Sequence, residues 1–312
     1  MLILWLVLMI LAVLFVCGGY VFFSACYRRK ETQWFNREAV ERTPYGKYYD
    51  CILDADRWLK DHNAQDVTII SKDGLRLHGQ WIPAENPIGT ILLVHGYRST
   101  KLVDFGVAFA YYHERNFNIL APEQRCHGQS EGRFITFGVK ESEDMLRWIR
   151  FHNVEYGELP LFLSGLSMGA STVMYMADQE LPRNVRGIIA DCGFTTPKEI
   201  IARVYRHVTH LPAAPVMPAV DIFARLLAGF SLSQKDTRRS LHNAKVPVLL
   251  IHGRDDRFVP CHMSEESYSA CGSKKNLLLV DGAGHGVSFL VAPDCYSQAV
   301  ESFIAENLER DQ

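Results

Sequence analysis

The sequence lacks the short motifs that mark several large classes of protein. It contains no Walker A loop, no dinucleotide-binding glycine fingerprint and no Cys/His cluster at zinc-site spacing. Its formal net charge is −2 and no basic patch with interspersed aromatic residues is present, so it offers no case for binding nucleic acid. Internal repeats and low-complexity tracts are also absent. What remains is a chain of 312 residues, 48% of them hydrophobic, which can bury one enzyme-sized core.

The cysteines also lack any regular spacing. A chain of this size does not need disulfide bonds to hold its fold, so a reducing compartment is the simpler interpretation. The eight cysteines are scattered over positions 17, 26, 51, 126, 192, 261, 271 and 295.

The first 26 residues contain no charged side chain and are rich in Leu, Ile, Val and Phe. This run is long enough to cross a membrane, so we expect a retained transmembrane anchor over residues 1–26. A secretory signal would carry basic residues before the apolar run, whereas Arg28, Arg29 and Lys30 follow it. A lipoprotein cleavage site ending at Cys26 is the weaker alternative. Because basic flanks stay on the cytoplasmic side, we predict a single-pass protein with its main domain in the cytoplasm.

After a polar connector over residues 27–65, expected to be helical, the hydrophobic pattern alternates between strands and helices. Two strands, 66–71 and 75–83, flank an Asp-Gly turn and predict a hairpin. The other expected strands cover 89–94, 118–121, 159–164, 186–190, 246–251 and 276–280, and the expected helices include 139–152 and 168–179. The alternation predicts an α/β fold over residues 66–312, with a mostly parallel central sheet, helices on both faces and catalytic loops at the carboxyl ends of the strands.

Residues 165–169 read Gly-Leu-Ser-Met-Gly and stand between an expected strand and an expected helix. This is the pattern of a nucleophile elbow, where a serine on a sharp turn presents its hydroxyl. Side chains at Gly165 and Gly169 would collide with the adjoining strand and helix. The pattern indicates that Ser167 is a nucleophile, although such short motifs also occur by chance on strand-to-helix turns.

Two later loops supply an acid and a base in the order Ser, acid, His. One expected strand runs into Asp255 and Asp256, and another runs into a glycine-rich loop that contains His285. A serine hydroxyl needs an imidazole base, which a carboxylate must orient. We therefore predict a triad of Ser167, Asp256 and His285. Asp255 and Asp191 compete for the acid position, and a turn residue or a surface histidine is the alternative interpretation.

The expected oxyanion hole follows from the same arrangement. One backbone N–H comes from Met168, the residue after the nucleophile, and the second comes from the loop after the third strand. That loop begins His95, Gly96, Tyr97, which makes Tyr97 the expected second donor. A plain strand-terminating turn is the alternative interpretation of the His-Gly pair.

Taken in order, these segments resemble the α/β-hydrolase superfamily, specifically its serine aminopeptidase-like and monoacylglycerol-lipase-like branch. The resemblance spans roughly residues 66 to 308 and includes an Arg-Cys-His-Gly-Gln-Ser-Glu-Gly run at 125–132. It implies an α/β-hydrolase fold. One departure is Cys126, where the family's pattern usually has glycine. A Cys126-His127 thiol dyad is an alternative that we disfavour, because the side chains of adjacent residues rarely point at each other.

Residues 195–245 interrupt the alternation, and in the resembled family an insertion here forms a lid over the serine. The run Thr-Pro-Lys-Glu at 196–199 is a capping box that predicts a helix start. A proline-rich stretch and a second apolar segment follow. Most of the apolar residues of this short helical lid are expected to pack against the body, with an acyl pocket as their alternative role: Val216, Met217, Ile222, Phe223, Leu226, Leu227 and Phe230.

The sequence thus predicts a membrane-anchored serine hydrolase that cleaves carboxylic esters, lipid-derived ones included, through an acyl-enzyme intermediate. A serine peptidase or aminopeptidase is the alternative, because a triad does not declare which bond is cut. A non-catalytic binding protein on the same fold is a third interpretation. The expected partners are a small ester or short peptide and the membrane, with no nucleic acid, cofactor or metal.

Overall fold

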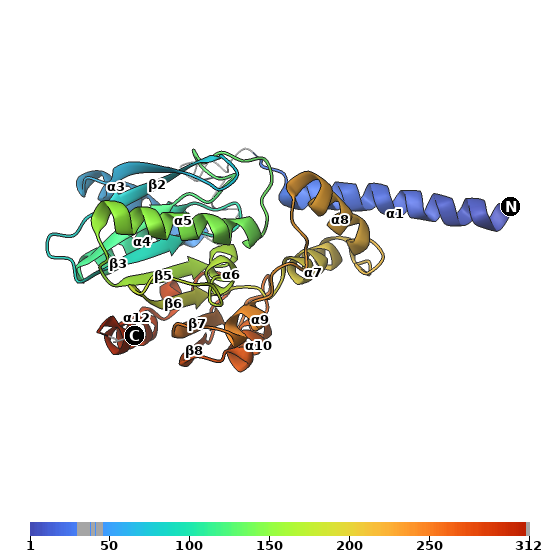
Figure 1. Cartoon of the computed structure of the whole chain (residues 1–312). Helices are drawn as coiled ribbons and strands as arrows, with labels where there is room; N and C mark the ends of the chain where they lie inside the picture. The colour runs from blue at the N-terminus through green and yellow to red at the C-terminus, as the bar shows by residue number, and fades with distance from the viewer. Residues whose placement is uncertain (30–37, 39–40, 42–45, 310–312) are drawn as a thin grey trace.

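The computed structural model describes residues 1–29, 38, 41 and 46–309. Part of the expected connector, Lys30 included, lies outside the described residues. The described part of the chain forms an eight-stranded sheet in the order β1-β2-β4-β3-β5-β6-β7-β8, with helices on both faces (Figure 1). Strand β1 (Gln65–Ile70) pairs antiparallel with β2 (Arg76–Ile82), and β2 pairs antiparallel with β4 (Phe117–Pro122). The other neighbouring strands are parallel, which confirms the predicted mostly parallel sheet.

Side chains alternate along each strand between two cores. On β3 (Gly89–Val94), Leu92 and Val94 face the core under α5 and α6, while Ile91 and Leu93 face the core under α3, α4 and α12. The sheet is completed by β5 (Leu161–Leu166), β6 (Val185–Asp191), β7 (Val248–Gly253) and β8 (Lys275–Val280). The helices of the body are α3 (Tyr49–Asp61), α4 (Lys101–His113), α5 (Val139–Tyr156), α6 (Met168–Met174), α9 (Thr237–His242), α10 (His262–Ala270), α11 (Ser288–Val291) and α12 (Pro293–Leu308).

Two helix lengths differ from the sequence-based expectation. Helix α6 ends at Met174 rather than near residue 179, because turns with short-range backbone hydrogen bonds follow it. Helix α5 continues to Tyr156, whose ring stacks on Trp81 of β2 at 3.8 Å. The expected connector is not a free linker throughout, since α3 packs against α4.

The insertion between β6 and β7 contains α9, named above, and three further helical segments. These are α7 (Pro197–Thr209), α8 (Met217–Phe223) and a π-helical turn η2 (Ala224–Ala228). The Thr196 hydroxyl accepts a hydrogen bond from the Glu199 N–H at 3.0 Å, which confirms the predicted helix start. Helix α1 (Leu2–Cys26) projects away from the body, and its last turns pack against α8 (Figure 1).

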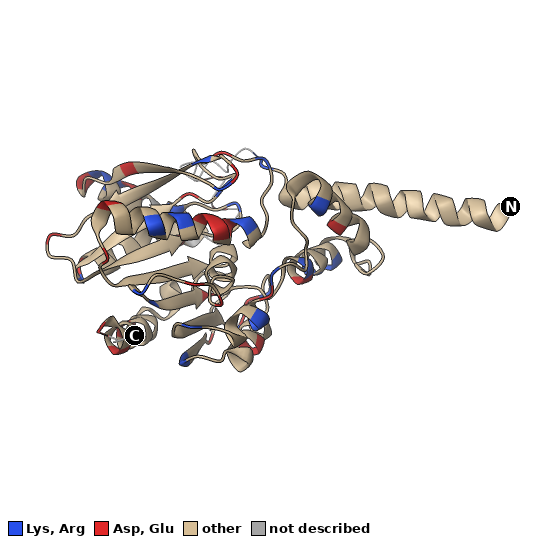
Figure 2. Cartoon of the chain, viewed as in Figure 1, with Lys and Arg blue, Asp and Glu red and all other residues tan. Residues whose placement is uncertain are grey.

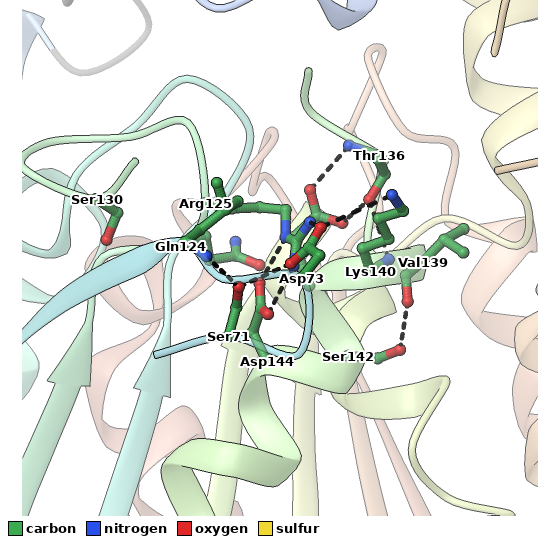
Figure 3. Close-up of polar contacts among 12 residues, drawn as sticks. Ser71, Asp73, Gln124, Arg125, Ser130, Thr136, Val139, Lys140, Ser142 and Asp144 are labelled. Carbon is green, nitrogen blue, oxygen red and sulfur yellow. Dashed lines mark hydrogen bonds and ion pairs between the residues drawn. The ribbon is translucent and has the colours of Figure 1, made fainter. Parts of the chain in front are cut away.

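A buried ion pair holds the long loop between β4 and α5 (Figure 3). The Arg125 guanidinium donates to both carboxylate oxygens of Asp144 at 2.6 and 2.7 Å. It also donates to Asp73, in the β1–β2 turn, at 2.9 Å. The side chains of Arg125 and Asp144 are only 5% and 1% exposed. The loop is therefore fastened to both the hairpin and α5, which fixes the segment that carries His127.

Replacing Arg125 with methionine should lower the free energy of unfolding by about 3–5 kcal/mol, because it leaves the Asp144 carboxylate buried without its partner. Urea unfolding of the detergent-solubilised chain measures this change. Arg150→Met, at an exposed position on the same helix as Asp144, is the matched control and should change the free energy by less than about 0.5 kcal/mol. Equal effects of the two substitutions would contradict a structural role for the ion pair.

Candidate active site

Ser167 stands on the turn between β5 and α6. Its backbone φ is 57° and ψ is −116°, a strained conformation for a residue with a side chain. A Cβ atom at Gly165 would overlap the backbone of Gly169, and one at Gly169 would overlap the carbonyl of Val94. These close approaches explain why both positions are glycine and why the turn presents the serine hydroxyl at the carboxyl end of the sheet.

Of the three residues predicted as a triad, His285 lies within hydrogen-bond distance of both Ser167 and Asp256. The Nε2 atom of His285 is 2.9 Å from the Ser167 Oγ, and its Nδ1 atom is 2.6 Å from the Asp256 Oδ2. Ser167 and Asp256 are each 6% exposed, and His285 is partly exposed. The imidazole thus bridges a serine hydroxyl and a buried carboxylate, which is the arrangement of a general base and its orienting acid.

The surroundings of Asp256 fix which of its oxygens faces the histidine. Its Oδ1 accepts hydrogen bonds from the N–H groups of Phe258 and Val259 at 2.8 and 2.9 Å. Its Oδ2 lies 3.2 Å from the Nε2 of His252 as well as contacting His285. Burial tends to raise the pKa of Asp256, but the hydrogen bonds with His252 and His285 outweigh it and hold this pKa well below its usual range. The sequence analysis assigned His252 no role.

The two competing aspartates lie in different environments. Asp255 is exposed on the loop surface. Asp191 is buried at the end of β6, where burial raises its pKa to about 6 and its Oδ1 accepts from the Ser288 hydroxyl at 3.3 Å. Since the His285 Nδ1 is engaged with Asp256, the geometry favours Asp256 as the orienting carboxylate.

The loop after β3 lies against the serine. A Cβ atom at Gly96 would stand 3.2 Å from the Cβ of Ser167, and Tyr97 lines the same cavity as Ser167. The Gly96 N–H donates to the Asp104 carboxylate at 2.5 Å, and the Ser99 hydroxyl donates to its other oxygen at 2.6 Å. Asp104, which sequence reasoning missed, therefore holds the loop that carries the expected oxyanion donor.

Two buried histidines hold the same loop through the backbone. The Nε2 of His95 accepts from the Gln124 N–H at 3.0 Å, and the Nε2 of His127 accepts from the Arg98 N–H at 2.9 Å. Their Nδ1 atoms contact backbone carbonyls at 2.9 Å, which assigns the proton to Nδ1 in each ring. Burial lowers the pKa of His95 to about 4 and that of His127 to about 3, so both rings are neutral acceptors.

The geometry gives no support to a Cys126-His127 dyad. Both ring nitrogens of His127 are engaged with backbone groups, and burial raises the pKa of the Cys126 thiol to about 12. Cys126 has a backbone φ of 68°, in the left-handed region that favours glycine. This conformation explains why the resembled family's pattern has glycine there.

Replacing Asp104 with asparagine should lower kcat at this site by about tenfold, with a smaller change in KM, because an amide offers only one acceptor and the loop loses one of its two anchors. Steady-state kinetics measure this split. Asp54→Asn, on the exposed surface of α3, is the control. A rise in KM at unchanged kcat would instead assign Asp104 to substrate binding.

A cavity of about 340 Å³ opens above Ser167, and most of its lining is apolar. Much of the wall comes from α7 and from the C-terminal part of α1. The contribution of α1 was not predicted from the sequence. The apolar residues between Val216 and Phe230, for which an acyl pocket was the alternative role, do not line this cavity. Several of them pack into the core beside the cavity. The residues lining the cavity are Tyr20, Val21, Ser24, Ala25, Arg29, Tyr97, Arg98, Phe137, Ser167, Phe194, Ile200, Ile201, Val204, Tyr205, Val208, Thr209 and Phe258.

Among the described residues, one group of side chains could also bind a metal ion. Atoms of Cys192, Asp256 and His285 lie within 4.8 Å of one another. Two of these residues are already hydrogen-bonded to each other, and burial raises the pKa of Cys192, which disfavours the thiolate. This arrangement is better suited to orienting the His285 imidazole through Asp256 than to binding a metal ion.

Comparison with known proteins identifies relatives over most of the chain. The sequence pattern of the family described as serine aminopeptidase, S33 matches residues 85–218 and 194–289. The protein YqkD of Bacillus subtilis is 26% identical over 237 residues, which cover 76% of this chain and 77% of YqkD. YfhR of Escherichia coli K12 is 27% identical over 269 residues, covering 84% and 87% of the two chains. The structure of the Pyrococcus furiosus esterase Pf2001 superposes with a TM-score of 0.66 at 24% identity, over 80% of this chain and 94% of that one, which shows a shared fold.

Proposed function

Because this chain belongs to the serine aminopeptidase S33 family of α/β-hydrolases, we propose that it is a serine hydrolase that cleaves carboxylic esters through an acyl-enzyme intermediate. The observation that carries the proposal is the continuous hydrogen-bonded chain from Ser167 through His285 to Asp256 at the base of an apolar cavity.

Each residue has a defined role in the proposed reaction. The Ser167 oxygen attacks the ester carbonyl carbon while His285 Nε2 takes its proton, and Asp256 stabilises the imidazolium that forms. The N–H groups of Met168 and Tyr97 donate to the oxyanion. The bond to the alcohol then breaks, and His285 returns the proton to the departing oxygen. A water molecule, deprotonated by the same nitrogen, attacks the acyl group. The bond to the Ser167 oxygen breaks as His285 returns that proton to it, which releases the carboxylic acid and regenerates the Ser167 hydroxyl.

The chemistry of the cavity favours esters over the aminopeptidase alternative. An aminopeptidase must bind the ammonium group of its substrate, and a buried ammonium needs a carboxylate partner. Among the described residues that line this cavity there is no Asp or Glu, whereas Phe, Ile, Val and Tyr side chains predominate.

A fluorophosphonate probe tests the proposal, because it labels an activated serine irreversibly. We expect the full-length chain to be labelled and Ser167→Ala to remain unlabelled. p-Nitrophenyl esters of increasing chain length, assayed beside aminoacyl p-nitroanilides, then distinguish esterase from aminopeptidase. Folded protein that takes up no probe would favour the non-catalytic binding protein, and faster cleavage of the anilides would favour the peptidase.

We further propose that residues 1–26 form a membrane anchor, followed by the connector 27–65 and the hydrolase domain 66–312 with its lid at 195–245. The properties of helix α1 support the proposal of an anchor. The helix is 25 residues long, the mean hydropathy of its most apolar stretch is 2.9, and only 11% of that stretch is buried. Figure 2 shows no charged residue along it. A signal sequence near the N-terminus would share these properties. Whether the mature chain keeps residues 1–26 distinguishes a retained anchor from a cleaved signal sequence.

The basic residues after the anchor predict the orientation of the protein. Because Arg28 and Arg29 follow the apolar helix, we expect the hydrolase domain in the cytoplasm. An impermeant protease added to intact cells should leave the domain undigested until the cells are lysed. Digestion without lysis, or a mature chain that starts near Cys26, would overturn this orientation.

A further inference from the structure

The C-terminal part of α1 lines the same cavity as Ser167. Tyr20, Val21, Ser24 and Ala25 contribute to the wall, next to residues of α7. Tyr20 is 75% exposed, and Val208 of α7, which also lines the cavity, is 69% exposed. The mouth of the cavity therefore lies between α1 and α7.

Helix α1 is also fastened to the loop expected to hold the oxyanion. The Tyr97 hydroxyl donates to the Ala25 carbonyl at 2.7 Å. The Arg98 guanidinium donates to the carbonyls of Ser24 and Tyr27 at 2.8 and 3.2 Å. The last carbonyls of a helix carry partial negative charge and lack partners within the helix, so a cation satisfies them well. The anchor thus ends in direct contact with residues beside the nucleophile.

The lid rests on the same helix. A Cβ atom at Gly18 would overlap Ala219 of α8, so the two helices approach closely there. The Phe223 ring lies 4.7 Å from that of Phe15 and 6.1 Å from that of Phe22, centroid to centroid. This packing places the lid along the part of the chain that we propose enters the bilayer.

The length of α1 sets the depth of the cavity mouth. A membrane-spanning helix needs about 20 apolar residues, so a span that begins at Leu2 reaches about Val21. Tyr20 and Val21 are the first residues of α1 that line the cavity, and the first charged side chain after them is Arg28. The lid also exposes large apolar side chains, with Leu226 75% and Leu211 57% exposed. The mouth consequently lies at the level of the membrane surface.

We propose that α1 is one wall of the acyl-binding site, and that the acyl chain of a membrane lipid ester enters this site from the bilayer between α1 and α7. An apolar path continuous with the bilayer spares a long acyl chain from contact with water. Binding of the acyl chain requires no catalysis, and only the hydrolysis of the bound lipid ester by Ser167 rests on the proposed function.

The test uses the full-length chain in phosphatidylcholine vesicles that contain a small fraction of phosphatidylcholine with a diazirine at the end of one acyl chain. After illumination, adducts are mapped by mass spectrometry. We expect adducts on Phe194 and Ile201, which line the cavity and are 2% and 4% exposed, so that a chain outside the protein cannot reach them. Val21→Trp should fill the entrance and reduce these adducts severalfold. Val16→Trp, at a 70% exposed position of α1, is the matched control and should not.

The outcomes separate this inference from the catalytic proposal, because labelling requires no hydrolysis. Adducts confined to the outward face of α1, or equal adducts in the two tryptophan variants, would overturn the acyl site. Cavity adducts that Val21→Trp removes would support it, even if no ester is cleaved; in that case the catalytic proposal alone would fail. A second readout is the ratio of p-nitrophenyl palmitate to p-nitrophenyl butyrate hydrolysis in vesicles, which should fall in Val21→Trp and remain that of the wild type in Val16→Trp.

Discussion

Replacing Ser167 with alanine is expected to lower the turnover of p-nitrophenyl esters by at least about a thousandfold. The substitution removes the hydroxyl oxygen that lies 2.9 Å from His285 Nε2, so the base has no nucleophile to activate. The fold should persist, because the turn is held by the close approaches of Gly165 and Gly169 and not by the serine hydroxyl. Steady-state kinetics in detergent measure the loss, and far-ultraviolet circular dichroism verifies the fold.

Ser269→Ala serves as the control, because this serine is exposed on α10 and its hydroxyl donates to the Glu265 carbonyl. It should retain the activity of the wild type. Ser167→Ala activity above about one per cent of wild type would show that another group carries the reaction, since residual catalysis without a nucleophile falls far below that level.

Much of the fold was predictable because the sequence encodes it locally. The Asp-Gly turn specifies the β1–β2 hairpin, and the register pairs Ile70 with Arg76 around it. The glycines flanking Ser167 reflect a steric requirement that any strand-to-helix turn of this sharpness imposes. The order of the strands then brings Asp256 and His285 to the same edge of the sheet as Ser167, because the carboxyl ends of parallel strands share one edge.

Other parts of the site could not be predicted, since they depend on contacts between distant segments. Tyr97 and Ala25 are 72 residues apart in the chain, and no local pattern shows that α1 docks on the loop after β3. Likewise, Asp104 lies in the first turn of α4, where a helix commonly carries an acidic residue. The sequence therefore does not indicate that the Asp104 carboxylate accepts a hydrogen bond from the Gly96 N–H. The cavity wall could not be predicted either. Several of the apolar residues between 216 and 230 pack into the core, as expected for most of them, whereas α1 and α7 supply much of the cavity lining, and apolar composition does not distinguish a core from a cavity wall.

Replacing Asp256 with asparagine is expected to lower kcat/KM by about a thousandfold to ten-thousandfold. The reason is geometric. The N–H groups of Phe258 and Val259 both donate to Oδ1, so the amide oxygen of asparagine must take that position and its NH₂ group must face His285. The Nδ1 atom would then accept rather than donate, which moves the ring proton to Nε2. An imidazole protonated at Nε2 cannot accept the proton of Ser167.

The same measurement on Asp255→Asn and Asp191→Asn discriminates among the three aspartates. Asp255 is exposed and should tolerate the change with nearly full activity. Asp191 is buried, and an amide can still accept from Ser288, so a modest loss is expected there. If Asp255→Asn proves the most damaging, the acid has been assigned one residue too late. If Asp191→Asn does, the orienting carboxylate belongs to β6, and the contact between Asp256 and His285 at 2.6 Å would then serve structure rather than catalysis.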